Sequence, residues 1–215
     1  MNFRSEVTDI NFYTDSTFSL RFERKGLQFQ TGQYIVLSLP EGGESREYSI
    51  ASGEKDPWLE VLIKAVPEGL FSTLLKNLRP GSKIEVDGPY GFFILKEKEV
   101  RTKKYVLVAT GTGIAPFESF IRTYPLLNYQ LFHGVRFIKE NYGKDVFPSA
   151  NCIICTTGDS KGDFSGRVTA CLQEKGIDAN KIYYLCGNSH MIDDVADILE
   201  EKGVPVRNLR SEVFF

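Results

Sequence analysis

The sequence predicts two domains in tandem: an antiparallel Greek-key β-barrel, then an α/β domain with a doubly wound, five-stranded parallel sheet. Short alternating apolar runs between turn residues fill the first half, and nothing there has a long helical period. Apolar runs of about five residues alternate with helical segments in the second half. A highly charged run separates the halves, so we expect a barrel over residues 1–100 and an α/β domain over residues 101–215.

The first half contains runs typical of β-strands, each bounded by turn residues. These strands are expected at Phe3–Asn11, Thr17–Glu23, Tyr34–Leu39, Arg46–Ala51, Trp58–Lys64 and Lys83–Asp87. A single helix is expected between the last two strands, over Leu70–Leu78. This number of short strands favours a small closed barrel, because closure removes the free edges of the sheet.

The charged run Lys96–Lys104 marks the change to alternating strands and helices. The strands are expected at Tyr105–Thr110, Tyr129–His133, Cys152–Thr156, Ile182–Cys186 and Val206–Phe214. The helices are expected at Pro116–Tyr124, Phe137–Tyr142, Val168–Glu174 and Met191–Lys202. In such a domain the ligand binds at the carboxyl ends of the strands.

Composition and charge argue against several kinds of partner. The 26 basic and 28 acidic residues leave a formal charge of −2, so no global field favours nucleic acid or an anionic membrane. The segment Met1–Glu6 has no apolar signal region, and no apolar stretch approaches the roughly 20 residues of a membrane span. We expect a cytoplasmic protein with neither a nucleic acid nor a membrane partner.

The pair Cys152 and Cys155 fits a C-x-x-C pattern, for which a redox dithiol or half a zinc site is an alternative. The pair lies in an apolar, strand-like run, where alternation points the two thiols to opposite faces. Since there is no second pair of ligands, we favour buried core cysteines and expect no metal.

A glycine-rich turn, Gly111-Thr112-Gly113, follows the first strand of the second half and leads to Pro116. Backbone N–H groups in such a turn and at a helix N-terminus can bind phosphate. Proline suits the first helical turn, where its missing N–H costs nothing. The motif is neither G-x-G-x-x-G nor a P-loop, so a plain strand-to-helix turn is the alternative.

The segment Arg46-Glu47-Tyr48-Ser49 is the most specific stretch of the first half. On a strand, Arg46 and Tyr48 share one face, while Glu47 and Ser49 share the other. An arginine can bind phosphate with two hydrogen bonds, a tyrosine can cover a ring, and a hydroxyl can reach a ring nitrogen. Together these groups suit a flavin nucleotide, and a solvated edge strand is the alternative.

Five motifs, in order, resemble the ferredoxin-NADP reductase family of flavin-dependent NAD(P)H reductases. They are Arg46–Ser49, Gly69–Ser72, Gly88–Gly91, Gly111–Pro116 and Cys186–Met191. The resemblance covers essentially the whole chain and implies a flavin ring held at the junction of the two domains. It implies FAD rather than FMN, and we favour NADPH, with NADH as the alternative.

The resemblance implies that the barrel binds FAD. Arg46 would bind the flavin phosphate, Tyr48 would pack on the ring, and Ser49 would lie near the reactive N5 atom. The other expected flavin-binding positions are Ile63, Lys64, Gly69, Leu70, Phe71 and Ser72.

The resemblance likewise implies that the second domain binds the nicotinamide nucleotide. Cys186–Gly187 would lie beside the nicotinamide ring. Arg136 and Arg167 would place positive charge near a 2′-phosphate, whereas Thr156–Asp159 offers a carboxylate where many NADPH enzymes carry an arginine. The remaining expected positions are Thr110, Gly111, Thr112, Gly113, Pro116 and Met191.

The last residues, Arg210–Phe215, are strand-like to the end of the sequence. By resemblance to plant-type members of the family, Phe214 would stack on the flavin and Glu212 would relay a proton near N5. Phe215 also falls at the flavin, so which phenylalanine stacks stays open, and a docked core strand is the alternative. The expected catalytic residues are Ser49, Cys186, Glu212 and Phe214.

The function implied by the resemblance is that of a flavoprotein oxidoreductase. It would pass hydride between NADPH and FAD N5, and single electrons between FAD and ferredoxin or flavodoxin. One alternative is an NADH-dependent reductase component of an oxygenase, or a free-flavin or quinone reductase on the same scaffold. Another is a non-catalytic flavin-binding electron-transfer subunit. We expect a monomer.

Overall fold

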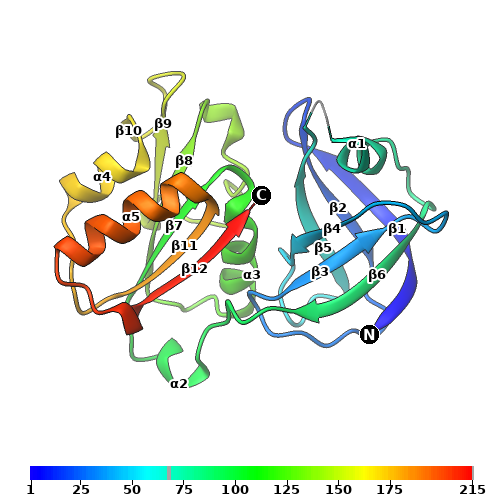
Figure 1. The fold of residues 1–215 in the computed structure, drawn as a ribbon, viewed down its shortest axis with the longest axis horizontal. Helices are drawn as coiled ribbons and strands as arrows, with labels where there is room; N and C mark the ends of the chain where they lie inside the picture. The colour runs from blue at the N-terminus through cyan, green and yellow to red at the C-terminus, as the bar shows by residue number, and fades with distance from the viewer. Residues whose placement is uncertain (67–68, 215) are drawn as a thin grey trace.

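The computed structural model describes residues 1–66 and 69–214, which form two sheets lying side by side (Figure 1). The first is antiparallel, with strand order β4-β3-β6-β1-β2-β5. Its strands are β1 (Asn2–Phe12), β2 (Thr17–Glu23), β3 (Tyr34–Ser38), β4 (Ser45–Ser49), β5 (Trp58–Lys64) and β6 (Lys83–Tyr90). Helix α1 (Leu70–Lys76) lies over one end of this sheet.

This first sheet curls around an apolar core but does not close completely. Ile50, just beyond β4, forms an isolated bridge to Val61 of β5, and the N–H of Ala51 donates to the Glu60 carbonyl. The next N–H of β5 in this region, that of Glu60, bonds to the Ser52 hydroxyl rather than to a backbone carbonyl. The Greek-key barrel is confirmed as an architecture, whereas full closure was wrong because the closing ladder is so short.

The second sheet is parallel, with strand order β10-β9-β8-β7-β11-β12. Its strands are β7 (Tyr105–Thr110), β8 (Tyr129–Val135), β9 (Cys152–Thr156), β10 (Phe164–Ser165), β11 (Ile182–Asn188) and β12 (Leu209–Phe214). The two-residue β10 makes six strands where five were expected. Helix α3 (Ala115–Thr123) covers the face toward the barrel, and α4 (Val168–Lys175) with α5 (Ser189–Glu201) covers the other (Figure 1).

Strand β7 shows why both faces are apolar. Leu107 and Ala109 belong to the core that includes α3, whereas Val106 and Val108 belong to the core beneath α4 and α5. Because successive side chains of a strand point to opposite faces, a buried parallel strand must be apolar at every position.

Two connections differ from the expected pattern. A 3-10 turn over Ile138–Glu140 replaces the helix expected at Phe137–Tyr142. There the Glu140 carboxylate accepts hydrogen bonds from the N–H groups of Arg136 and Phe137, which closes the turn on itself. The charged run between the sheets contains a short helix, α2 (Glu97–Val100).

Helix α3 joins the second sheet to the barrel through buried polar contacts. Thr31 Oγ1 donates to Ser119 Oγ at 2.7 Å, and Ser119 Oγ donates to the Ser52 carbonyl at 2.7 Å. Arg122 lies 3.8 Å from Glu60 and 3.5 Å from Glu118, both of which are buried. The two sheets are therefore fixed against each other along this part of the seam.

Among the described helices, none is both long enough and apolar enough to cross a membrane.

Candidate functional site

The barrel and the end of the chain meet through a hydrogen bond between Ser49 and Glu212. Ser49 Oγ donates to Glu212 Oε2 at 2.8 Å, joining β4 to β12. Burial raises the pKa of the Glu212 carboxyl, the Ser49 hydrogen bond partly opposes this effect, and Glu47 adds a further increase. The carboxyl therefore keeps its proton to a higher pH than an exposed glutamate does.

Cys186 lies beside this pair, since its register partner on β12 is Glu212. The side chain is fully buried in β11, and on its other side it pairs with Ala109 of β7. Burial raises the pKa of the thiol well above its ordinary value. Cys186 is thus a small neutral side chain rather than a thiolate nucleophile.

The turns after β7 and β11 interlock at the point where the strand order reverses. A Cβ on Gly113 would lie 2.4 Å from the Cys186 carbonyl oxygen, and one on Gly187 would lie 2.4 Å from Thr110 Oγ1. Thr110 Oγ1 also accepts the N–H of Asn188 at 2.9 Å. In open α/β sheets, ligands bind where the strand order reverses. The two closely packed turns therefore form a ready-made surface for a ligand at this point.

The predicted glycine turn is a 3-10 turn, Gly111–Ile114, which runs directly into α3. Pro116 falls in the first turn of α3, as expected. Gly111 adopts a φ of +53°, a conformation that favours glycine. The turn's N–H groups lie at the carboxyl end of β7, where a phosphate could be bound.

On the barrel side, Arg46 is exposed and Tyr48 is half-buried. The Arg46 guanidinium pairs with Glu44 at 3.0 Å and donates to the Ser45 carbonyl. Tyr48 packs on the barrel core, and burial raises the pKa of its phenol to about 12, so the ring stays neutral. The Arg46 guanidinium is therefore already paired within its own segment of the chain.

The segment before and within α1 turns some predicted residues inward. Ile63 and Phe71 are buried in the barrel core, so their side chains do not face a ligand. Lys64 and Leu70 are exposed. Ser72 Oγ donates to the Gly69 carbonyl and accepts the N–H of Val66, both at 3.3 Å, which shapes the start of α1.

Arg136 and Arg167 are both exposed beyond the carboxyl ends of the parallel strands. The Arg136 guanidinium lies 5.3 Å from the centre of the Phe137 ring, and Arg167 is the N-cap of α4. Asp159, from the loop after β9, uses its carboxylate to accept the N–H of Ile138 at 3.1 Å.

The other predicted positions are placed as follows. Phe214 is half-buried opposite Asn188 and packs against the core that includes α3. Met191 is buried in the first turn of α5, and its N–H donates to Asn188 Oδ1 at 3.4 Å. Phe215 lies outside the described residues.

Sequence reasoning missed Tyr34 and the role of Gly91 at the seam. Tyr34 pairs with Ser49 across β3 and β4. A Cβ on Gly91 would lie 2.9 Å from the Tyr34 ring and 4.0 Å from Glu212 Oε1. The Gly88–Gly91 motif was the available signal, and its last glycine makes room for the tyrosine ring.

The thiols of Cys152 and Cys155 face different cores, as strand alternation predicted. Cys155 is buried, and burial raises the pKa of its thiol and that of the neighbouring Cys171. Within residues 1–66 and 69–214, no three metal-ligating side chains are grouped for a metal ion.

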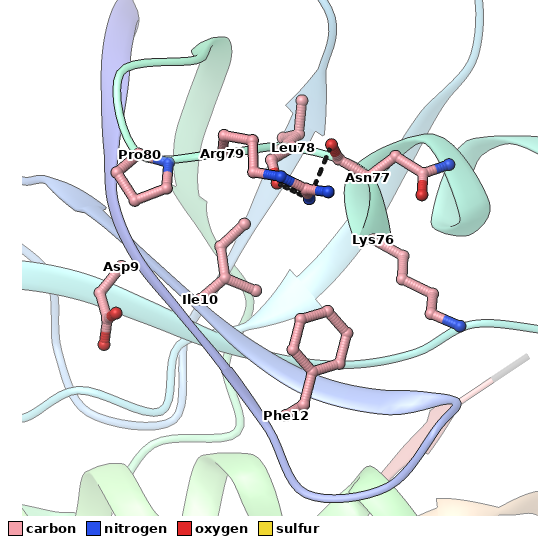
Figure 2. A pocket seen from close by; sticks show the side chains of 8 residues that line it. All are labelled: Asp9, Ile10, Phe12, Lys76, Asn77, Leu78, Arg79 and Pro80. Atoms are coloured by element: carbon pink, nitrogen blue, oxygen red, sulfur yellow. Dashed lines mark hydrogen bonds between the residues drawn. The ribbon is translucent and has the colours of Figure 1, made fainter.

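An open hollow of about 460 Å³ lies elsewhere, on the barrel between β1 and the connection from α1 to β6 (Figure 2). Its lining residues are Asp9, Ile10, Phe12, Lys76, Asn77, Leu78, Arg79 and Pro80. None of the predicted site residues lines it.

Comparison with known proteins identifies both halves of the chain. Residues 7–94 match the oxidoreductase FAD-binding domain, and residues 107–197 match the oxidoreductase NAD-binding domain. The chain is 27% identical to the electron transfer component of toluate 1,2-dioxygenase from Pseudomonas putida, over 99% of this chain and 67% of that protein. It is 29% identical to the flavodoxin/ferredoxin--NADP reductase of Escherichia coli, over 88% of this chain and 86% of that protein.

The fold is similar to that of a ferredoxin NADP+ reductase from Neisseria gonorrhoeae solved with FAD and NADP. The TM-score is 0.88 at 21% identity, over 100% of this chain and 99% of that one. The chain spans 58% to 67% of the length of the curated oxygenase reductases that it matches over nearly its whole length. Its two matched domains, in this order and with this fold, place the chain in the ferredoxin reductase-like family of FAD- and NAD(P)-binding oxidoreductases.

Proposed function

We propose that the protein oxidises NADPH at a bound FAD and passes the electrons singly to ferredoxin or flavodoxin. The observation that carries this proposal is the Ser49–Glu212 hydrogen bond beside Cys186. It joins the FAD-binding motif of the barrel to the edge of the parallel sheet where the nicotinamide would lie. When bound, FAD supplies the ability to accept a hydride and to release single electrons.

The residues at the start of α1 fit a dinucleotide phosphate. A Cβ on Gly69 would lie 2.4 Å from Val66 Cγ2 and 2.9 Å from Ser72 Oγ, so a side chain at this position would crowd the start of α1. The exposed Arg46 guanidinium would add a charged donor, and the Ser72 hydroxyl would add another once it releases the Gly69 carbonyl. Backbone N–H groups, a hydroxyl and an arginine are the groups that bind phosphate oxygens.

The chain's own residues would orient and protect the reacting groups. Tyr48 would pack on one side of the flavin ring, and Phe214 would cover the face that the nicotinamide must reach. Cys186 would let the nicotinamide approach closely because it is small and neutral. Ser49 fixes Glu212, whose buried carboxyl would hold or transfer a proton at Oε1, the oxygen that Ser49 does not occupy.

The charges near the proposed ribose site support NADPH. In the described part of the chain, no carboxylate forms an ion pair with Arg136 or Arg167, so both are free to bind a 2′-phosphate. The Asp159 carboxylate is occupied by the N–H of Ile138, which reduces its repulsion of a phosphate.

A second candidate is an NADH-dependent reductase component of an oxygenase. The similarity to the toluate 1,2-dioxygenase component extends over 99% of this chain. If Asp159 released the Ile138 N–H, its carboxylate could instead accept a hydrogen bond from the ribose 2′-hydroxyl of NADH.

An anaerobic titration of the purified, FAD-loaded protein tests the proposal. We expect the yellow protein to be bleached by NADPH at a lower concentration than by NADH, and the reduced protein to be reoxidised by ferredoxin or flavodoxin. A protein that does not retain FAD would overturn the proposal. Preference for NADH, with reoxidation by an oxygenase or its ferredoxin, would establish the second candidate. Reoxidation by quinone or free flavin alone would show that neither ferredoxin nor flavodoxin is the electron acceptor.

A further inference from the structure

We propose that His133 is a positioning residue that orients the nucleotide-binding turn by holding the carbonyl of Gly111. This inference rests on the proposed function of that turn. His133 lies in β8, opposite Ala109 of β7, and is fully buried. Its Nε2 lies 2.9 Å from the Gly111 carbonyl oxygen, at the point where β7 ends and the turn begins.

The hydrogen bond fixes more than one atom because the peptide bond is planar. In a trans peptide the carbonyl and the following N–H point in opposite directions. With the Gly111 carbonyl held against His133, the N–H of Thr112 must point away from β8. Gly111 adopts a φ of +53°. Because glycine has no Cβ, its backbone has wide conformational freedom without such a restraint.

The protonation state of His133 fits this role. Burial lowers the pKa of the imidazole to about 4, so the ring is neutral near neutral pH. A neutral imidazole carries one N–H, and the Gly111 carbonyl can only accept, so the proton resides on Nε2. Nδ1 is buried without a hydrogen-bond partner in the part of the chain that the structure describes.

A buried imidazole with only one of its two nitrogens hydrogen-bonded lowers the stability of the protein compared with an apolar side chain. The bond to Gly111 is therefore the contact that distinguishes histidine from an aliphatic residue at this position. The ring is also held from the barrel side, because Tyr142 lies beside it with ring centres 6.2 Å apart. The Tyr142 hydroxyl in turn lies 3.2 Å from Thr17 Oγ1 of β2.

The test compares His133→Gln with His133→Met. The two new side chains have nearly the same length and volume, but only glutamine can donate a hydrogen bond near the position of Nε2. Binding of NADP+ and NAD+ to the FAD-loaded protein is measured by calorimetry. For the preferred nucleotide we expect His133→Met to raise the Kd about tenfold and His133→Gln to stay within about twofold of wild type.

Both variants should keep the FAD content of wild type, and His133→Gln should be no more stable than His133→Met, which separates positioning from general stability. Equal affinity in wild type and His133→Met overturns the inference, and so do equal losses in both variants. If wild type binds neither nucleotide, the proposed function fails together with the inference. If wild type binds and His133→Met does not differ from it, the inference alone fails.

A spectroscopic measurement on the wild type gives an independent readout. The chain has two histidines, His133 and His190, so the ¹⁵N spectrum of histidine-labelled protein can be assigned with a single variant, His190→Gln. We expect one imidazole with a protonated Nε2 and an unprotonated Nδ1, with no titration between pH 6 and 8, because its pKa is near 4. A buried imidazole protonated on Nδ1, or one titrating in that range, would overturn the inference.

Discussion

The two halves of the proposed site are built differently. On the nicotinamide side, the backbone forms the surface: Gly113 packs on the carbonyl of Cys186, and Gly187 packs on Thr110. On the flavin-phosphate side, Arg46 is 57% exposed and its charge is directed at Glu44. The nicotinamide half is therefore preformed, whereas the flavin-phosphate half depends on an exposed side chain that is paired with Glu44.

This difference decides how the two halves should respond to substitution. A surface made of close-packed backbone cannot accept even a methyl group without moving, so binding and stability should fall together. An exposed side chain with a weak ion pair adds little to stability, so its loss should affect binding alone. The first two predictions test this contrast directly.

The largest effect is expected for Gly187→Ala. Its φ of +128° strains any other residue, and the new Cβ would lie 2.4 Å from Thr110 Oγ1. We expect the free energy of unfolding to fall by about 3 kcal/mol and the Kd of the nicotinamide nucleotide to rise at least about tenfold. Urea unfolding and calorimetry measure the two quantities.

Gly43→Ala is the matched control, since its φ is +102° but no atom lies within 4 Å of the new Cβ. We expect it to cost about 1 kcal/mol from backbone strain and to leave nucleotide binding unchanged. If the two variants behaved alike, close packing between the turns would not be what shapes the nicotinamide side.

Arg46→Ala should show the opposite pattern. We expect the Kd of FAD to rise about tenfold or more, because a charged donor to phosphate is lost, while the Tm of the apoprotein stays within about 2 °C of wild type. Flavin fluorescence during titration of the apoprotein measures the affinity. Arg4→Ala, which removes an exposed arginine paired with Glu85, is the control and should change neither quantity.

Ser49→Ala tests the contact where the two halves meet. The Ser49 hydrogen bond lowers the pKa of Glu212 against the effect of burial, so its loss should raise that pKa further. We expect the midpoint of the pH dependence of flavin reduction to move to higher pH. Stopped-flow absorbance measures the profile.

Glu212→Gln cannot ionise and is the companion variant for this measurement. The pH profile of flavin reduction in Glu212→Gln should lack the titration step that moves to higher pH in Ser49→Ala. A step of the same midpoint in wild type, Ser49→Ala and Glu212→Gln would show that another group controls the pH dependence.

Local patterns in the sequence predicted the regular elements well, and contacts between distant segments decided the rest. Strands β2 and β5 begin and end as predicted, because apolar alternation and flanking turns are properties of neighbouring residues. The helix expected at Phe137–Tyr142 does not form, partly because Asp159, from another loop, binds the N–H of Ile138. Closure of the barrel failed for a related reason, since it depends on how β4 meets β5.

The same distinction applies to the site. Motifs placed Ser49 and Glu212 near the flavin by resemblance, but their direct hydrogen bond depends on how the two domains pack. Tyr34 lies in no motif that announces its contacts, because a tyrosine within an apolar strand is equally suited to a core.

The smallest effect is expected from a substitution of Glu118, which lies in α3 where this helix packs against the barrel. Burial raises the pKa of this carboxyl to about 8, with Arg122 opposing the shift and Glu60 adding to it. In the unfolded chain Glu118 loses its proton near its ordinary value of 4.5, whereas the native protein keeps it to about pH 8. The unfolded state thus binds fewer protons between these values, and stability falls as pH rises through this window.

Glu118→Gln should remove this contribution. Relative to the variant, wild type should lose at least about 1 kcal/mol of unfolding free energy between pH 5 and pH 8, measured by urea denaturation. Glu201→Gln, an exposed change, should leave the pH dependence as it is in wild type. Cofactor affinities at pH 7 should not change in either variant, because Glu118 acts on the packing of α3 against the barrel rather than on a ligand. A large change in nucleotide affinity would instead mean that the preformed half of the site depends on the charge state of the seam.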